Sequence, residues 1–216
     1  MNIVIICGGS KEEAMIDLTP YIEREATFIG VDHGTLTLLD QGITPVAAIG
    51  DFDSVTEEEY ERIKKNVSHV DKYQAAKDET DIELASKYAM RYQPDLVLFT
   101  GVTCGRLDHM FSMMRLLYRL QVAHKETRFH IQNEKNDLAV ALQGSSLIPS
   151  QEKWPYISFF AATPKVTDVT LKGFLYEVTN DELTFGTTRF TSNELTEEYG
   201  EVHIGSGALY VVRSSD

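Results

Sequence analysis

Aspartates follow short apolar runs at several points in the first half of the chain. Asp32 comes directly after Thr27–Val31, and Asp51 and Asp53 come just after Val46–Ile49. If these runs are parallel strands, their carboxyl ends meet at one edge of the sheet, where open α/β folds bind ligands. Two carboxylates spaced Asp-x-Asp can hold a hard divalent cation, although aspartates after strands are also ordinary turn formers. The spacing therefore favours a cation site without requiring one.

A second acidic group lies in the sequence Lys77-Asp78-Glu79-Thr80-Asp81. Asp78 and Asp81 are spaced i,i+3, so on a helix they would lie on the same side. Acids are also favoured at helix starts by capping and by the helix dipole, and that alone would explain part of the group. Capping does not require Lys77 or a second aspartate, and their presence favours a ligand site.

A glycine-containing turn with a cation and an acid occupies residues 100–109, between a strand-like run and a helical one. Its backbone N–H groups can donate to phosphate oxygens, Arg106 adds a fork of donors, and Asp108 follows. The turn lacks the Gly-Lys-Ser/Thr of a P-loop. Carboxylates with magnesium and a few cations are how proteins hold a nucleoside triphosphate for phosphoryl transfer. That is the chemistry which the three groups predict together.

The elements that must position these groups alternate between strand and helix over the first 133 residues. Two capping-box sequences, at Thr56–Glu59 and Thr80–Glu83, predict helices running to Asn66 and to about Tyr92, and an apolar face predicts a third over Leu107–His124. The expected strands are Asn2–Cys7, Thr27–Val31, Val46–Ile49, Leu96–Thr100 and Arg128–Gln132. This alternation predicts an open, mostly parallel sheet with helices on both faces.

After about residue 133 short β-prone runs replace the helical patterns. The expected strands are Tyr156–Ala161, Val166–Leu171, Phe174–Val178, Leu183–Phe185, Arg189–Thr191, Val202–Ile204 and Ala208–Val212. Asn180-Asp181 and Gly205-Ser206-Gly207 are expected to form hairpin turns. We therefore expect an α/β domain over residues 1–133 and an all-β domain, a sandwich or small barrel, over residues 134–216. The boundary is set to within roughly ten residues, because the 130–142 region could supply strands to either domain.

Composition excludes some classes of function. The 216 residues carry a net charge of −13, which disfavours a general nucleic-acid binder. The two cysteines do not suggest a disulfide framework, and a reducing cytoplasm is expected. The apolar run Ile3–Cys7 is too short to span a membrane.

Four motifs resemble, in order and spacing, the signature motifs of the thiamine pyrophosphokinase family. They are Gly30-Val31-Asp32-His33-Gly34, Gly50-Asp51-Phe52-Asp53-Ser54-Val55, Lys77-Asp78-Glu79-Thr80-Asp81-Ile82-Glu83 and Gly105-Arg106-Leu107-Asp108-His109. Tyr156–Phe160, Leu171–Tyr176 and Thr191–Glu194 are similar to the thiamine-binding domain of that family. The resemblance covers nearly the whole chain, and the motifs are specific as a set.

The resemblance implies a magnesium-dependent homodimer that moves the β,γ-pyrophosphoryl group of ATP onto the hydroxyethyl oxygen of thiamine and releases AMP. The metal ligands implied are Asp51, Asp53 and Asp81. The nucleotide-binding residues implied are Asp32, His33, Lys77, Asp78, Thr80 and Arg106. Ser192 and Asn193 are implied on the thiamine side, reaching the active site from the partner subunit. Asp108 is also expected to bind substrate. The expected catalytic residues are Asp81, Asp108 and Arg106, one of the two acids accepting the hydroxyl proton.

Two positions depart from the family pattern. His33 stands where many members have glycine, and Leu195 stands where some members place an aromatic residue against the thiamine rings.

Two other functions remain open at this stage. Asp51-Phe52-Asp53 could be the metal motif of a nucleotide-sugar transferase, although that class does not explain the groups around Asp81 and Asp108. A non-catalytic sensor of thiamine or nucleotide on the same scaffold is the second alternative.

Overall fold

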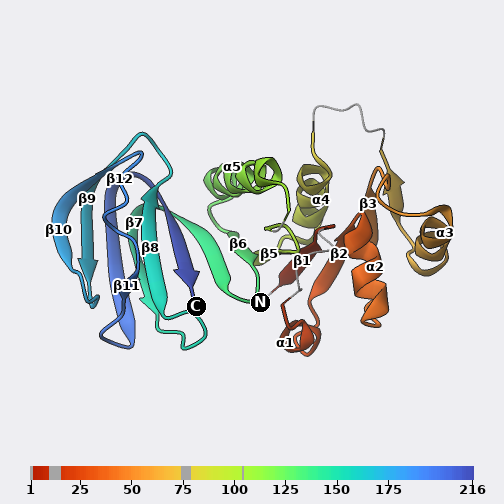
Figure 1. Ribbon diagram of the computed structural model, residues 1–216, viewed down its shortest axis with the longest axis horizontal. Helices are drawn as coiled ribbons and strands as arrows, with labels where there is room; N and C mark the ends of the chain where they lie inside the picture. The colour runs from red at the N-terminus through yellow and green to blue at the C-terminus, as the bar shows by residue number, and fades with distance from the viewer. Residues whose placement is uncertain (1, 10–15, 74–78, 104) are drawn as a thin grey trace. The chain divides into compact units, whose positions relative to one another are not determined.

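The computed structural model of the chain describes residues 2–9, 16–73, 79–103 and 105–216, and it divides into two compact units. We call residues 1–116 with 124–134 the N-terminal unit, and residues 117–123 with 135–216 the C-terminal unit. The ribbon is drawn in Figure 1. Each unit is described separately below.

The N-terminal unit is built on a parallel sheet with strand order β6-β5-β1-β2-β3-β4. The strands are β1 (Ile3–Cys7), β2 (Thr27–Val31), β3 (Ala47–Gly50), β4 (Val70–Lys72), β5 (Leu96–Thr100) and β6 (Arg128–Gln132). The helices are α1 (Thr19–Ile22), α2 (His33–Asp40), α3 (Glu57–Asn66), α4 (Asp81–Ala89) with a 3₁₀ turn over Met90–Tyr92, and the first part of α5 (Leu107–Ala123), whose residues from 117 on belong to the C-terminal unit. The predicted parallel α/β architecture is confirmed.

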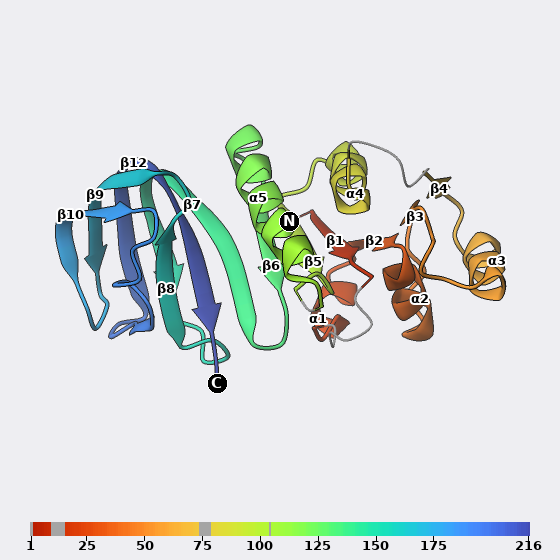
Figure 2. The same cartoon turned by 45° about the horizontal axis from the view of Figure 1, so that its top comes forward.

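Helices cover both faces of this sheet because its central strand is apolar on both sides. All five residues of β1 are buried, and successive side chains of a strand point to opposite faces. Ile3 and Ile5 belong to a core cluster with Leu38 of α2. On the other face α4 packs against β1 and β2 and buries Ala85 and Ala89. Figure 2 shows α4 and α2 on opposite sides of these strands.

The C-terminal unit is an antiparallel β structure whose longest strand pairs with three other strands. The strands are β7 (Asn136–Pro149), β8 (Tyr156–Ala161), β9 (Lys165–Lys172), β10 (Val178–Thr184), β11 (Asn193–Glu194) and β12 (Tyr199–Ser214). β12 pairs with β7 along one edge, and with β9 and then β8 along the other. β10 extends the sheet beyond β9, and β11 beyond β8. A core cluster joins these strands, with Phe159 and Phe174 in edge-to-face contact at 5.6 Å between ring centroids. The predicted all-β second part is confirmed.

Several predicted elements of this unit differ from the structure. Gly205–Gly207 does not form the predicted hairpin turn. Strand β12 continues through these residues: it pairs with β7 up to Ile204 and again from Ala208, with a shift of register between the two. Asn180 and Asp181 lie inside β10 rather than in a hairpin turn, at another irregularity of register.

Two further segments predicted as strands are loops. Residues 173–177 form a loop in which Phe174 makes an isolated bridge with Leu195, and residues 185–192 form turns and irregular structure. Each of these loops buries an aromatic side chain in the core, Phe174 in the first and Phe190 in the second, and this explains the β-prone residues there. Conversely α2, β4 and most of β7 were not predicted from the sequence.

Within the residues that the structure describes, no helix is both long enough and apolar enough to cross a lipid bilayer.

Candidate active site

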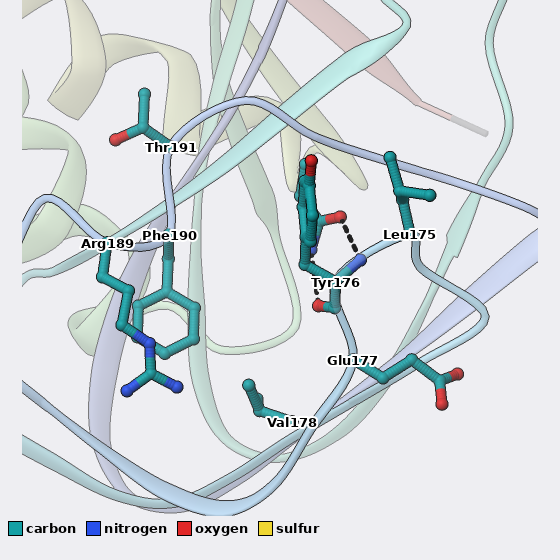
Figure 3. Close-up of a pocket in the computed structure, with 8 residues that line it drawn as sticks. Leu175, Tyr176, Glu177, Val178, Arg189, Phe190 and Thr191 are labelled. Atoms are coloured by element: carbon teal, nitrogen blue, oxygen red, sulfur yellow. Dashed lines mark hydrogen bonds between the residues drawn. The ribbon is translucent and has the colours of Figure 1, made fainter.

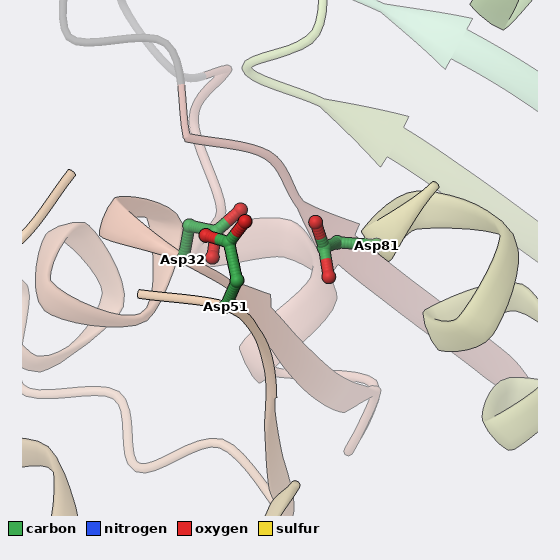
Figure 4. Close-up of side chains that lie close together, drawn as sticks. All are labelled: Asp32, Asp51 and Asp81. Atoms are coloured by element: carbon green, nitrogen blue, oxygen red, sulfur yellow. The ribbon is translucent and has the colours of Figure 1, made fainter. Parts of the chain in front are cut away.

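Three aspartates from three different elements meet at the carboxyl edge of the parallel sheet. Asp32 follows β2, Asp51 follows β3, and Asp81 is the first residue of α4. One carboxylate oxygen of each lies within 4.8 Å of one oxygen of the other two. Figure 4 shows Asp32 and Asp51 side by side with Asp81 facing them. We call Asp32, Asp51 and Asp81 the acidic cluster.

Unusual backbone conformations hold Asp32 in place. Asp32 and Phe52 have positive φ angles, 48° and 58°, which residues other than glycine rarely adopt. Phe52 is buried, and its backbone N–H donates to Asp32 Oδ1 at 3.1 Å. Such conformations cost of order 1–3 kcal/mol each and persist where the surrounding structure enforces them, often at functional sites.

A capping box fixes Asp81. The Thr80 hydroxyl accepts a hydrogen bond from the Glu83 backbone N–H, and the Glu83 carboxylate accepts one from the Thr80 N–H at 3.0 Å. Helix α4 therefore begins at Asp81, whose carboxylate lies at the positive end of the helix dipole. Thr80 is thus the N-cap of α4, and its role in nucleotide binding stays a prediction.

The carboxylates of this edge repel one another. The pKa of Asp32 is raised to about 7, chiefly by burial and further by the negative charges of Asp81, Asp51 and Asp53, while the hydrogen bond from the Phe52 N–H opposes the rise. The pKa of Asp53 is also raised, chiefly by the charge of Asp51. A group of anions that resists its own ionisation gains stability when a cation joins it.

The donors present fit a magnesium ion. The acidic cluster offers three carboxylates and neither nitrogen nor sulfur, the set that hard divalent cations such as Mg²⁺ prefer. Asp53, predicted as a ligand, lies outside the acidic cluster and donates its backbone N–H to Asp51 Oδ1 at 3.0 Å. Asp32, predicted as a nucleotide contact, lies inside the cluster.

An exposed ion pair forms at the start of α5. The Arg106 guanidinium donates to both carboxylate oxygens of Asp108, with Nε at 3.1 Å from Oδ1. This pairing lowers the pKa of Asp108 to about 2. A carboxyl group with so low a pKa is a weak proton acceptor near neutral pH. The paired side chains are 71% and 61% exposed, so Arg106 can exchange this partner for an anionic ligand at little cost.

The C-terminal unit has a pocket of about 410 Å³ beside β10 and β11. Figure 3 shows the side chains around it. They are Leu175, Tyr176, Glu177, Val178, Arg189, Phe190, Thr191 and Asn193. The predicted Ser192 adjoins this lining: it is exposed, has a φ of 56°, and donates its backbone N–H to Ser158 Oγ at 3.0 Å.

Both units match descriptions of one protein family. "Thiamin pyrophosphokinase, catalytic domain" matches residues 18–131, and "Thiamin pyrophosphokinase, vitamin B1 binding domain" matches residues 145–209. The chain is 38% identical over 216 residues to thiamine pyrophosphokinase of Bacillus subtilis (strain 168), with all of both chains covered. The chain belongs to the thiamine pyrophosphokinase family.

Solved structures of thiamine pyrophosphokinases have the same fold. The Bacillus subtilis structure matches with a TM-score of 0.91 at 37% identity, covering 100% of both chains. The Geobacillus thermodenitrificans structure matches with a TM-score of 0.89 at 34% identity, covering 99% of this chain and 98% of the other. The Candida albicans structure, at 13% identity, still gives a TM-score of 0.84 over 99% of this chain and 89% of the other, which shows the shared fold.

The chain is therefore an enzyme with the activity of thiamine pyrophosphokinase, as its motifs predict. Neither a nucleotide-sugar transferase nor a non-catalytic sensor is favoured. His33 is half-buried at the first position of α2, next to Asp32. Lys77 and Asp78 lie outside the described residues.

Sequence reasoning missed residues that shape the acidic cluster and the pocket of the C-terminal unit. Phe52 positions Asp32 through its backbone, and its place between two aspartates was the available signal. Glu177 and Arg189 line the pocket, but the short β-prone runs that contain them predict strands; Tyr176, which lines it too, lies in a segment already noted as similar to the thiamine-binding domain.

Proposed function

We propose that the N-terminal unit binds ATP with magnesium, and that the chain transfers the β,γ-pyrophosphoryl group of ATP to thiamine. The observation that carries this proposal is the acidic cluster at the carboxyl edge of the parallel sheet, where α/β folds bind nucleotides. The thiamine hydroxyl oxygen forms a bond to the β-phosphorus. The bond from that phosphorus to the α,β-bridging oxygen breaks, AMP leaves with the bridging oxygen, and the hydroxyl proton is released.

Asp32, Asp51 and Asp81 would hold the magnesium ion, with Asp53 close to Asp51. Bound there, magnesium would neutralise charge on the phosphates and on the leaving AMP. The acidic cluster and Arg106 would together hold ATP in position for in-line attack. Such positioning supplies much of the catalysis in phosphoryl transfer.

Arg106 would bind the phosphates of ATP and would form no covalent bond in the reaction. Its guanidinium is exposed and already oriented by Asp108, so it can donate to phosphate oxygens. We assign Asp108 to substrate positioning through Arg106. While Arg106 pairs with Asp108, the pKa of Asp108 is lowered to about 2 and this carboxylate is a weak proton acceptor; Asp81 is the other carboxylate that we propose as the base.

The C-terminal unit supplies the thiamine side. This proposal is supported by the match of residues 145–209 to a vitamin B1 binding domain and by the pocket next to Ser192. We further propose that the enzyme works as a homodimer in which Ser192 and Asn193 of one subunit serve the active site of the other. With ATP as donor and two cysteines in the chain, we place it in the cytoplasm.

One reaction tests the proposal. Purified protein is incubated with ATP, thiamine and magnesium chloride, and the products are separated by chromatography. We expect thiamine diphosphate and AMP in equal amounts, and neither without thiamine or with excess chelator. ADP with thiamine monophosphate would contradict pyrophosphoryl transfer. Hydrolysis of a sugar nucleotide, with no AMP formed from ATP, would support the transferase alternative instead.

A further inference from the structure

The ring of Tyr60, on α3, packs against the ring of Phe52. The two ring centroids are 5.1 Å apart, with an angle of 47° between the ring planes. Phe52 is 4% exposed and belongs to a core cluster with Ile63 of α3, and Tyr60 is half-buried against the same cluster. Aromatic rings in contact stabilise one another beyond the area that they bury. Tyr60 is therefore a specific neighbour of the Phe52 side chain.

Two lysines hold the Tyr60 ring from other directions. Lys64, four residues further along α3, places its ammonium nitrogen 5.1 Å from the ring centroid, and Lys72, the last residue of β4, places its own at 4.7 Å. A cation within about 6 Å of the centre of an aromatic ring is attracted by the face of the ring. The position of the Tyr60 ring is therefore tied to β4 and to residue 52 as well as to its own helix.

These contacts lie on either side of Asp51 in the chain. Before Asp51, Gly50 pairs in register with Lys72, and its carbonyl accepts a hydrogen bond from the Tyr73 N–H at 2.9 Å. After Asp51, Phe52 meets the Tyr60 ring. The strand β4 thus holds the chain just before this aspartate, and Tyr60 holds it just after.

The backbone of Phe52 needs such support. Its φ of 58° is rare for a residue other than glycine, and a conformation of this kind persists only where surrounding contacts enforce it. In this conformation the Phe52 N–H donates to Asp32 Oδ1 at 3.1 Å. Among the residues that the structure describes, Tyr60 is the aromatic residue whose ring contacts Phe52. A contact on the Phe52 ring can therefore govern the orientation of Asp32.

We propose that Tyr60 is a positioning residue for the metal site. Its ring keeps the Phe52 backbone in the conformation that directs the N–H at Asp32, and this sets the affinity of the acidic cluster for magnesium. The inference rests on the proposed role of the acidic cluster as a magnesium site. It goes beyond that role by assigning a residue of α3, a helix that carries none of the three carboxylates.

Magnesium binding to the nucleotide-free protein tests the proposal without any reaction. A ligand that binds the folded state raises the free energy of unfolding with its concentration, so urea titrations at a series of magnesium concentrations give the Kd. Tyr60→Ala should raise the Kd for magnesium at least about fivefold, because the site is no longer preorganised. Tyr60→Phe keeps the ring and should keep the wild-type Kd. A wild-type Kd in Tyr60→Ala overturns the positioning role.

If Tyr60→Ala does not fold, Tyr60→Leu takes its place in the same titrations. Leucine keeps much of the apolar volume but offers no ring face to the two ammonium groups. It should also raise the Kd for magnesium, and a wild-type Kd in Tyr60→Leu would then refute the proposal.

Tyr92→Ala is the matched control for a general loss of stability. Tyr92 is a half-buried tyrosine of the same unit, and its ring pairs with that of Tyr88 at 6.1 Å, beyond the end of α4 that is remote from Asp81. This variant should lower the free energy of unfolding and leave the Kd for magnesium unchanged. An equal rise of the Kd in Tyr92→Ala and Tyr60→Ala would show an effect of stability alone and would rule out a positioning role.

A Phe52→Gly background tests whether Tyr60 acts through residue 52. Glycine adopts a positive φ without steric cost, so the backbone no longer needs the ring contact. In that background Tyr60→Ala should raise the Kd for magnesium by less than about twofold. A full rise there would mean that Tyr60 acts on the acidic cluster by another route, and would contradict the proposal. If Phe52→Gly does not fold, the comparison of Tyr60→Ala with Tyr60→Phe decides.

The same variants separate this inference from the proposed reaction. In steady-state kinetics Tyr60→Ala should raise the magnesium concentration for half-maximal activity and leave the KM for thiamine unchanged. If the wild type binds magnesium and Tyr60→Ala binds it more weakly, but no AMP is formed, the reaction is wrong and the positioning role stands. If magnesium does not stabilise the wild type, the metal site and the role of Tyr60 are both wrong.

Discussion

Gly50 lies directly against the Asp32 carboxylate: a Cβ on Gly50 would fall 1.9 Å from Asp32 Oδ1. That oxygen is the one that accepts the Phe52 N–H. No side chain fits at residue 50 unless Asp32 moves, and movement would break the hydrogen bond and the acidic cluster together. The absence of a side chain at Gly50 is therefore part of the proposed metal site.

Gly50→Ala should impair magnesium use more than folding. We expect the magnesium concentration for half-maximal activity to rise at least about tenfold, because Asp32 is displaced. Gly42→Ala is a control in the same unit, since a Cβ there meets no atom within 4 Å. Its positive φ predicts a loss of stability of about 1 kcal/mol without any change in magnesium dependence. Equal magnesium profiles for the two variants would contradict the role of Gly50.

The two capping boxes of the N-terminal unit offer a matched comparison. Thr56 caps α3 and Thr80 caps α4 with the same pair of hydrogen bonds, but α4 alone carries a residue of the acidic cluster. Thr56→Ala and Thr80→Ala should each lower the free energy of unfolding by about 1 kcal/mol in urea titrations. Thr80→Ala should also raise the magnesium requirement, because Asp81 begins the frayed turn. If Thr56→Ala raised it equally, the effect would be one of stability.

The pH dependence of the free energy of unfolding should reveal the raised pKa of Asp32 in metal-free protein. A pKa raised from 3.8 to about 7 in the folded state means that folding favours the protonated acid. The contribution of the Asp32 carboxyl group to the free energy of unfolding is therefore largest below pH 4, and it is lost as the pH rises through 7. The free-energy difference between Asp32→Asn and wild type should therefore change by on the order of 4 kcal/mol over this range, in favour of the variant at high pH.

Urea titrations in chelator at several pH values measure this difference. Magnesium added at pH 8 should stabilise the wild type more than Asp32→Asn, because only the wild type presents three carboxylates to the ion. A difference between the two proteins that is constant from pH 4 to pH 8 would show that Asp32 is not perturbed.

Asp108→Asn should leave the shape of the pH–rate profile unchanged. Arg106 holds the Asp108 pKa at about 2, so this carboxyl group is already ionised across the working range and does not supply the titration that a general base would. We expect a higher KM for ATP through a less well oriented Arg106, by about tenfold or less. Loss of the acidic limb of the kcat profile would show that Asp108 does accept the proton.

The parts of the site that depend on strand ends could be predicted from the sequence. Asp32 and Asp51 follow apolar runs, and parallel pairing brings such positions to one edge whatever the details of packing. Which acids share one point depends on side-chain direction. Asp53 follows Asp51 by two residues, yet Phe52, with its positive φ, lies between them and the backbone is not extended there, so the Asp-x-Asp spacing did not place both carboxylates in the cluster.

The elements that escaped prediction are those with weak local signals. β4 is three residues long and partly charged, and it is a strand because β3 offers it an edge. Helix α2 begins with His33-Gly34-Thr35, poor helix formers that are accommodated because Gly34 packs against the Cys7 and Gly8 carbonyls, where a Cβ would lie 2.2–2.4 Å away. In the C-terminal unit, tertiary pairing with β7 overrode the turn signal of Gly205–Gly207.

The acidic cluster also has a consequence for how the chain reaches its native state. Its three members come from segments far apart in the sequence, so an unfolded chain has no preformed site. The site exists only when β2 and β3 are in register and α4 has docked. Such non-local contacts form slowly, because loop closure must precede them. Magnesium should therefore leave the early steps of refolding unaffected and act after the parallel sheet has assembled.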